Sequence, residues 1–453
     1  MHTYSKGPKT MQRFHAAALA AAALVLPLAG CSTDDILNVN TPNIVDPGSL
    51  ENATGAAALR AGAIGDFAFA YSGDAGGTEG MVLLTGLMAD EFFNGDTFST
   101  RQEPDQRNID VANGTLQAVF RNIQRARESA RRAARALAAL PTPNNTQAAE
   151  MKALEAFAYV LIGEAYCNAV PFSEEINGAV VPGMPRTNQE TFQIAIAKFD
   201  SALALTTDAT ISSLARVGKA RAQVDLGQYA AAATTVASVP TSFRYVFRHS
   251  ETTSRQQNGV MVFSWVSRRW TTFNREGGNG LPFHSDPRTA VKADGNAFDG
   301  TVPLFLPLKY PTRSTSITLA DGIEARLIEA EAALQANNTT SFLNILNSLR
   351  ATPPSYAFIN TGGTLPPLTD PGTQAGRVDL LFAERAYWMF GTSHRLGDLR
   401  RLVRQYSRGA ETVFPTGSYF KGGSYGGNVN IPVPVDEQNN PNFDRAACVT
   451  SQA

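Results

Sequence analysis

Apolar residues follow a helical spacing over much of the chain after residue 50. The clearest case is a predicted long helix, one face of which carries Leu116, Val119, Phe120, Ile123, Ala126, Ala130, Ala133 and Leu137. Steps of three and four residues place such positions on one side of an α-helix, which is typical of a helix packed against a core. The other sides bear arginines between Arg121 and Arg135. We interpret them as a solvated or partner-facing surface, because no aromatic residues are interleaved with them as in nucleic-acid sites.

Helical segments of this kind recur in pairs. The pairs are Glu150 to Cys167 with Thr191 to Leu205, Ser213 to Pro240, and Ala325 to Ala336 with Phe342 to Arg350, and the opening stretch supplies a fourth. Within the second pair, small residues and prolines approximate the spacing of a tetratricopeptide repeat. We therefore predict a mainly α fold with four tetratricopeptide-type helical hairpins, in a scaffold at about 116–240 and 317–405.

The segment between the two parts of the scaffold has a different pattern. Residues 241–316 are rich in aromatic, glycine and polar residues and show few helical periods. Within them, Val260 to Val266 is predicted to be a short strand. Residues 360–373 and 414–427 are predicted loops, the latter within a C-terminal loop region at 406–453. Loops held by a rigid scaffold commonly carry binding residues, so we expect recognition in these segments.

The first thirty residues are predicted to be a targeting signal. Three cations precede a short apolar run at residues 16–28, and Leu28 to Cys31 forms a lipobox. Cleavage before Cys31 would leave a lipid-modified cysteine, followed by a tether over residues 31–48. A plain secretory signal with an incidental cysteine is the alternative, and translation starts at either Met1 or Met11. Ser32 after the cysteine favours the outer membrane.

Composition fits a large folded domain at residues 49–453. The 453-residue chain is 43% hydrophobic, which is enough for a sizeable core, and its formal net charge of −1 gives no support for a nucleic-acid partner. Two cysteines remain after the lipobox, Cys167 and Cys448. In an oxidising compartment they are a possible disulfide, and two unrelated buried thiols are the alternative.

The stretch from Val378 to Leu402 combines two abutting helices with a high density of charge. The first helix is apolar on nearly every side and contains Glu384 next to Arg385, so we expect a buried helix with an internal ion pair. In the second helix, Arg395, Asp398 and Arg401 lie at spacings that allow neighbouring side chains to pair.

This stretch resembles the C-terminal signature of the SusD/RagB family of nutrient-binding outer-membrane lipoproteins. The matching positions are Glu384, Arg385, Arg395, Asp398, Leu399 and Arg401. Two positions depart from the family pattern: Trp388 stands where a glutamate is usual, and Thr392-Ser393-His394 replaces the usual tripeptide. Further likenesses follow in the family's order, in residues 158–174, 285–288 (Ser-Asp-Pro-Arg), 325–335 and 431–442. The resemblance therefore covers almost the whole chain after the signal.

What the resemblance implies is a SusD-like α-helical fold and a non-catalytic role. Members capture a nutrient, most often an oligosaccharide, at the cell surface. They deliver it to a SusC-like TonB-dependent transporter, to which they are bound as a lid. Capture of peptides, as in RagB-like proteins, and an envelope assembly scaffold without a ligand site are the alternatives.

Motifs for catalysis are weak in this chain. Residues 422–426 satisfy the G-x-S-x-G pattern but lack the strand before and the helix after that a nucleophile elbow requires. Asp90, Glu91 and Asp96 suggest a glycosidase, yet a helix end with loop polar residues explains them as well. The histidines form no known metal-ligand motif. We therefore predict no enzyme activity, no metal and no cofactor.

Binding of a glycan needs flat aromatic surfaces for stacking and polar groups for the hydroxyls. Two segments offer both kinds of residue, and the alternative is that most of these aromatic residues are core. The candidate ligand-binding residues are Phe92, Phe93, Asn94, Asp96, Phe98, Trp265, Arg268, Trp270 and Phe273.

Overall fold

The computed structural model describes residues 52–176, 178–272, 274, 280–356 and 364–453. The predicted signal peptide, Cys31, the tether and Phe273 lie outside the described residues. Residues from Glu51 to the C-terminus form one compact unit. None of the helices in the described part of the chain combines the length and hydropathy needed to cross a bilayer.

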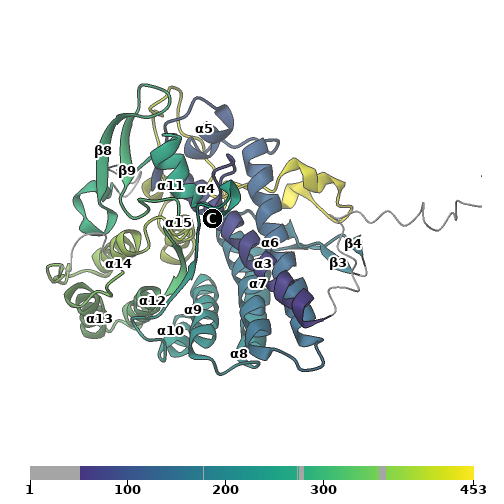
Figure 1. Cartoon of the computed structure of the whole chain (residues 1–453). Helices are drawn as coiled ribbons and strands as arrows, with labels where there is room; N and C mark the ends of the chain where they lie inside the picture. Colours follow the sequence, from purple (N-terminus) through teal and green to yellow (C-terminus); the bar gives the residue numbers. More distant parts are fainter. Residues whose placement is uncertain (1–51, 177, 273, 275–279, 357–363) are drawn as a thin grey trace, which may run out of the picture. The chain divides into compact units, whose positions relative to one another are not determined.

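A row of packed helices forms the scaffold. Each helix contacts the next one in the series, and Figure 1 shows α8 to α10, α12 and α13 side by side along one side of the fold. The helices are α3 (Ala53–Ser72), α6 (Gly114–Ala138), α7 (Asn145–Ala165), α8 (Asn188–Leu203), α9 (Ala209–Asp225), α10 (Tyr229–Val236), α12 (Gly322–Gln335) and α13 (Thr339–Ala351). The helix pairs predicted from the apolar spacing are all present.

Local sequence explains where these helices begin and how closely they pack. Thr187 and Glu190 form a reciprocal capping box at the start of α8. Asn113 accepts hydrogen bonds from two backbone N–H groups at the start of α6. At the crossing of α8 and α9, a Cβ added to Gly218 would lie 2.2 Å from the ring of Phe199. Glycine at this position therefore allows the two helices to approach.

The remaining elements are mostly short and include the C-terminal helices. The helices are α4 (Met81–Met88), α5 (Ser99–Asp105), α11 (Gly259–Met261), α14 (Gln374–Trp388), α15 (Arg395–Tyr406) and α16 (Ala410–Val413). Short 3₁₀ turns lie at Ser254–Gln256, Phe283–Ser285, Pro287–Thr289, Val435–Asn439 and Arg445–Ala447. Strands form two-stranded antiparallel ribbons: β1 (Phe92–Asn94) with β7 (Trp270–Thr272), β2 (Val170–Pro171) with β5 (Pro185–Arg186), β3 (Glu174–Ile176) with β4 (Ala179–Val181), β6 (Arg244–Phe247) with β10 (Ile317–Asp321), and β8 (Val291–Asn296) with β9 (Pro303–Pro307). The fold is mainly α with loop-rich insertions, as predicted.

The strand predicted at Val260 to Val266 is wrong. The segment is helical: α11 is followed by a π-helical turn over Val262–Val266. Asn258 caps this helix by accepting a hydrogen bond from the backbone N–H of Met261 at 3.1 Å. A short apolar run is compatible with either a buried strand or a buried helix, and here the cap decides for the helix.

The predicted internal ion pair between Glu384 and Arg385 is also wrong, because each side chain pairs with another element. Glu384 accepts hydrogen bonds from Arg288 of the Asp-Pro-Arg turn at 2.8 Å and from Arg350 of α13 at 2.6 Å. Trp388, which stands where the family has a glutamate, donates its indole N–H to Glu384 at 3.0 Å. Neighbours on a helix point in different directions, so the two charges reach different partners.

Arg385 instead contacts Asp398 of α15 at 2.9 Å, and Arg401 contacts the same carboxylate at 2.8 Å. Arg401 also binds Glu331 of α12. Burial alone would raise the pKa of Asp398, but the charges of Arg385 and Arg401 hold it far below its ordinary value. These buried ion pairs join α14 and α15 to the scaffold.

The C-terminal segment returns to the scaffold at the end of α7. Ile431 donates to the carbonyl of Ala165 at 2.8 Å and accepts from the N–H of Cys167 at 3.0 Å. Beside this bridge, the sulfur atoms of Cys167 and Cys448 form a disulfide. The pairing of the two cysteines fastens the final loop region to α7.

The shared carboxylate of Asp398 makes a direct test of the buried network. We expect Asp398→Ala to lower the free energy of unfolding by about 3–5 kcal/mol, because the buried Arg385 loses its carboxylate partner and Arg401 keeps only Glu331. The matched control is Asp379→Ala, which removes the surface ion pair to Arg408 and should cost about 1 kcal/mol or less. Urea denaturation measures both, and equal effects would contradict the structural role of the network.

Candidate ligand-binding site

Two segments that are far apart in the sequence meet in one antiparallel ribbon. Strands β1 and β7 pair so that Phe92 faces Thr272, Phe93 faces Thr271, and Asn94 faces Trp270. The N-terminal and central groups of predicted ligand residues therefore lie side by side. Strand β9 packs against β7 on its other side and completes the surface.

A pocket of about 700 Å³ opens beside this ribbon. Its apolar walls come from Phe93, Phe305 and Phe420, and hydroxyl and amide groups stand between them. The full lining is Phe93, Asp96, Thr97, Gln102, Thr271, Thr272, Asp299, Thr301, Val302, Pro303, Phe305, Phe420 and Lys421. Aromatic walls with a few convergent polar groups are typical of a small-molecule site.

Half-exposed phenylalanines lie at and near this pocket. Phe98, Phe298 and Phe420 are 52%, 51% and 44% exposed, which is unusual for such large apolar side chains. The Phe420 ring lines the pocket and packs on Phe93 with a centroid distance of 5.1 Å. Phe98 and Phe298 are not part of the lining. They flank Arg269, whose guanidinium lies 5.0 Å from the Phe98 ring and 4.5 Å from the Phe298 ring.

Charged groups at the pocket are bound to each other. Asp96 accepts hydrogen bonds from Arg101 at 2.8 Å and from Arg269 at 2.6 Å. Lys421 contacts the Asp299 carboxylate at 2.6 Å and donates to the backbone carbonyl of Asp96 at 2.6 Å. Although burial alone would raise the pKa of Asp299, hydrogen bonds from Lys421 and from two backbone N–H groups lower it. The carboxylate is therefore held in its charged form.

The loop that carries Phe420 and Lys421 is fastened to β1 through a buried carboxyl group. Asp105 accepts a hydrogen bond from the hydroxyl of Tyr419 at 2.6 Å and another from the backbone N–H of Asn94 at 3.0 Å. Burial raises the pKa of Asp105 to about 7, although both hydrogen bonds act in the opposite direction. The position of the Phe420 wall therefore depends on a group that titrates near neutrality.

Several predicted ligand residues are core residues instead. Trp270 is fully buried and packs on Phe263, and Phe92 packs on Phe390. Trp270 has neighbours on both sides because β7 lies between β1 and β9. The side chain of Asn94 is buried and accepts from the N–H of Asp96, so it shapes the turn after β1. Because Trp270, Phe92 and Asn94 are buried, the prediction that they contact a ligand is wrong.

Trp265 and Arg268 lie outside the pocket lining. The Trp265 indole N–H donates to the carbonyl of Pro307 at 3.2 Å, and the half-buried ring packs against Leu304 and Leu306. Arg268 is bound to Asp294 at 2.5 Å. Phe93 and Asp96 do line the pocket, although both are largely buried, and Phe98 lies outside the lining, against Arg269. Phe273 lies outside the described residues.

Residues that sequence reasoning missed include Phe298, Asp299, Phe305, Phe420 and Lys421. The loop at 414–427 was predicted to be a site of recognition, but its aromatic residues were not singled out. A usable signal was the isolated Phe-Lys pair in a glycine-rich loop, where a large apolar residue has little local reason to be buried.

The Asp90 and Glu91 carboxyl groups do not form a catalytic pair at the pocket. Both residues are buried, and neither lines the pocket. Glu91 accepts a hydrogen bond from the backbone N–H of Gly391 at 3.1 Å, which ties the end of α4 to the turn after α14. Within the described residues, no group of His, Cys, Asp and Glu side chains is arranged to hold a metal ion.

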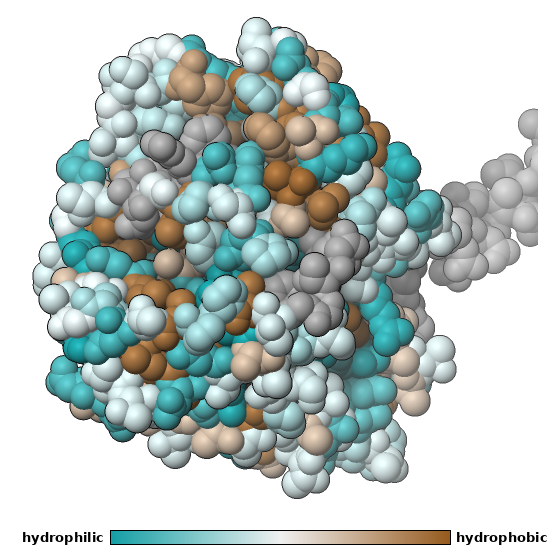
Figure 2. Space-filling model, turned by 90° about the vertical axis from the view of Figure 1, so that its left-hand side faces the viewer, coloured by the Kyte–Doolittle hydropathy of each residue, from teal (hydrophilic) through white to brown (hydrophobic). Residues whose placement is uncertain are grey.

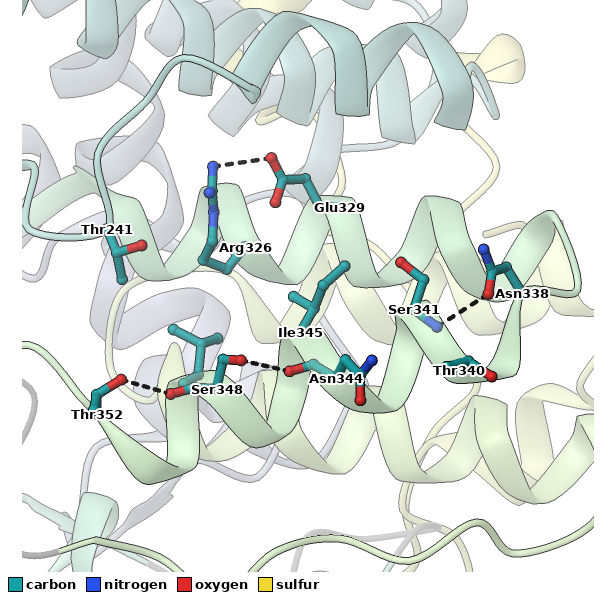
Figure 3. A pocket seen from close by; sticks show the side chains of 11 residues that line it. Thr241, Arg326, Glu329, Asn338, Thr340, Ser341, Asn344, Ile345, Ser348 and Thr352 are labelled. Atoms are coloured by element: carbon teal, nitrogen blue, oxygen red, sulfur yellow. Dashed lines mark hydrogen bonds and ion pairs between the residues drawn. The ribbon is translucent and has the colours of Figure 1, made fainter.

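A second pocket, of about 640 Å³, lies between α12 and α13. Figure 3 shows hydroxyl and amide side chains along α13, and on α12 it shows Arg326 and Glu329 paired with each other. Several of its polar groups are used locally: Ser348 and Thr352 donate to carbonyls one turn earlier on α13, and Arg326 contacts Glu329 at 2.9 Å. Its lining contains no aromatic residue. It therefore fits a stacking ligand less well than the pocket beside β1.

The surface that carries β8, β9, α13 and α14 has a mixed character. Figure 2 shows hydrophobic residues in separate patches with polar residues between them. Such a surface can stack apolar faces and hydrogen-bond polar edges of one ligand.

Comparison with solved structures identifies the architecture. One SusD-like carbohydrate-binding protein from Bacteroides fragilis superposes with a TM-score of 0.63 at 13% identity, over 87% of this chain and 100% of that one. A SusD superfamily protein from Bacteroides vulgatus gives 0.59 at 16% identity, over 88% and 98%. The chain has the SusD-like fold. No protein-family model and no curated protein matches it.

A SusD-like fold is what the C-terminal signature predicts, and the motifs now have structural roles. A further SusD-like carbohydrate-binding protein from Bacteroides vulgatus gives a TM-score of 0.54 at 16% identity, over 76% of this chain and 82% of that one. At these identities the likeness extends to the fold, and the ligand has to be argued from the pocket itself.

Asp105 makes the pocket sensitive to pH. Its pKa in the folded chain, about 7, lies above the ordinary value, so the contact is most stable below about pH 4 and weakens as the pH rises through 7. We expect the loop around Tyr419 to open at least about tenfold more often at pH 8 than at pH 5, the equivalent of one pKa unit. Hydrogen exchange corrected for intrinsic rates measures this opening.

The control for this prediction is Asp105→Asn, which preserves an acceptor for Tyr419 and Asn94 but does not titrate. Its loop should open to the same extent at both pH values. A pH dependence that persists in Asp105→Asn would assign the effect to another group.

Proposed function

We propose that this chain is a non-catalytic carbohydrate-binding protein of the SusD-like class. The observation that supports it is the pocket beside β1 and β7, whose lining combines three phenylalanines with threonines, a glutamine and charged side chains. A sugar ring has an apolar face of C–H groups and a polar edge of hydroxyls, and such a surface matches both. Solved structures with this fold include proteins described as carbohydrate binding.

The chemistry of the pocket favours capture over cleavage. Hydrolysis of a glycosidic bond uses one carboxylic acid that is protonated near neutral pH and one carboxylate. Asp299 has a lowered pKa and is bound to Lys421, and the Asp96 carboxylate is shared by two arginines. Neither group is placed to give a proton to a leaving group. We therefore propose that the ligand leaves unchanged.

Delivery to a SusC-like TonB-dependent transporter and anchoring in the outer membrane are part of the same proposal. Their support is the lipobox ending at Cys31 and the family signature in α14 and α15. The anchor would hold the binding protein at the cell surface, close to a transporter that takes up its ligand. Lipid modification is tested by mass spectrometry of the mature N-terminus.

The walls of the pocket provide the binding test. We expect Phe420→Ala and Phe305→Ala each to weaken binding of an oligosaccharide about 2- to 12-fold, as loss of a stacking contact of about 0.5–1.5 kcal/mol requires. Isothermal titration against a panel of oligosaccharides measures the affinity, and the same mixtures are analysed for cleavage products. Val180→Ala, an exposed apolar residue of the β3 and β4 ribbon, is the control.

Two results would contradict the proposal. Products released from any glycan would show an enzyme. Binding that is unchanged in both wall variants would place the site elsewhere, and the groove between α12 and α13 would be the next region to vary.

The basic face of α6 is the proposed contact with the transporter. Arg121, Arg125, Arg132 and Arg135 are exposed, whereas Arg127 and Arg131 of the predicted basic surface are buried. We expect Arg121→Glu with Arg135→Glu to reduce co-purification with the transporter at least about tenfold, because complementary charges steer and register an interface. Arg121→Lys with Arg135→Lys retains the charge and is the control. Unchanged co-purification of the glutamate variant would exclude this face.

A further inference from the structure

The charged side chains around the ligand pocket form a closed cluster. It contains the three cations Arg101, Arg269 and Lys421 and the three carboxylates of Glu79, Asp96 and Asp299. Arg101 joins Glu79 to Asp96, Arg269 adds to Asp96, and Lys421 binds Asp299. The cluster is therefore neutral, and every cation in it has a carboxylate partner.

The positions of these groups are fixed by neighbouring contacts. Asp299 accepts hydrogen bonds from the N–H groups of Thr301 and Val302 at 2.9 and 3.0 Å, and its own N–H donates to the carbonyl of Gly95 at 2.9 Å. Lys421 is held by two oxygen partners, on Asp299 and Asp96. Neither side chain can turn toward a ligand without breaking contacts that it already makes.

Arg269 is constrained in the same way. Its guanidinium is bound to Asp96 and lies over the rings of both Phe98 and Phe298. Two aromatic faces and one carboxylate hold its plane, since a guanidinium stacks on rings as well as pairing with an anion. Arg268, the adjacent cation, is bound to Asp294.

We infer that the pocket takes an uncharged oligosaccharide and rejects acidic glycans and the charged ends of peptides. The inference rests on the proposed carbohydrate-binding function and names the ligand class of that same site. In the described part of the pocket wall every cation is already paired, so a carboxylate or sulfate buried there would lose its water without gaining a free positive partner, which is unfavourable. The hydroxyls of a neutral sugar need donors and acceptors only, and paired ions still provide both.

The experiment compares an acidic ligand with its uncharged ester and with neutral oligosaccharides. The probes are hexagalacturonate as the free acid and as the methyl ester, together with uncharged hexasaccharides of glucose, xylose and mannose. Binding is measured by isothermal titration calorimetry with the full chain at about 50 and about 500 mM NaCl. Between these concentrations the distance over which exposed charges interact shortens about threefold. We expect at least one uncharged probe to bind, with an affinity that changes less than about twofold with salt.

Each outcome has one meaning. Binding of uncharged probes, with the free acid at least about tenfold weaker than its ester, supports the inference, because a buried unpaired charge costs more than 1.4 kcal/mol. Binding of the free acid as tightly as the ester, or more tightly than the uncharged probes, overturns it and leaves carbohydrate binding intact. No binding to any saccharide overturns the proposed function itself and this inference with it.

A substitution in the cluster tests the cause. Asp299→Asn keeps the side-chain oxygen that accepts from Thr301 and Val302 but leaves Lys421 without its carboxylate. The variant should shift the ratio of acid to ester affinity toward the acid by about tenfold or more, the value of a new charge-assisted hydrogen bond. Asp294→Asn, which frees Arg268 outside the pocket lining, is the matched control and should leave the ratio unchanged. An unchanged ratio in Asp299→Asn would overturn charge compensation as the cause.

Discussion

One buried carboxylate connects the insertion at residues 241–316 to the helical scaffold. Glu384 of α14 is almost fully buried and is shared by Arg288 of the insertion and Arg350 of α13. A charge at such a depth is tolerated only when partners neutralise it and satisfy its lone pairs. The insertion therefore has one favourable way to dock, with the Asp-Pro-Arg turn against α14. Any arrangement that left one of these buried charges without a partner would be strongly disfavoured, so a single arrangement is selected.

The same region positions the ligand pocket. The turn after α14 places Gly391 in the left-handed region, with a φ of 63°, where its N–H donates to Glu91 and its carbonyl accepts from the hydroxyl of Tyr310. Glu91 immediately precedes β1, and β1 pairs with β7 of the insertion. The scaffold thus holds β1 through the turn after α14, and it holds the segment that contains β7 through Arg288. The pocket depends on both attachments.

The features that could be predicted from the sequence are those that depend on residues close together in the chain. The helix pairs and the two helices of the C-terminal signature depend on local spacing, and these predictions agree with the structure, whereas the ion-pair partners of Glu384 and Arg385 come from other elements. Whether an aromatic residue is buried depends on which segments come together. Trp270 is core because β7 packs against both β1 and β9, and Phe92 of β1 is core because it packs on Phe390, whereas Phe98 and Phe298 remain half exposed beside Arg269. Composition alone cannot separate these cases, and Phe420 was missed because its loop has no periodic pattern.

Ion pairs have two different consequences in this molecule, and their position decides between them. Around Glu384 and Asp398 the buried pairs join separate elements, so their geometry fixes how the helices pack. Around Asp96 and Asp299 the carboxylates are also largely buried, but they line the wall of a pocket, where their neutralisation leaves no net charge for a ligand. A wall of this kind can hydrogen-bond many hydroxyls without attracting counter-ions or charged polymers. Selectivity for an uncharged ligand then follows from pairing within the protein, and it requires no group that repels the competitors.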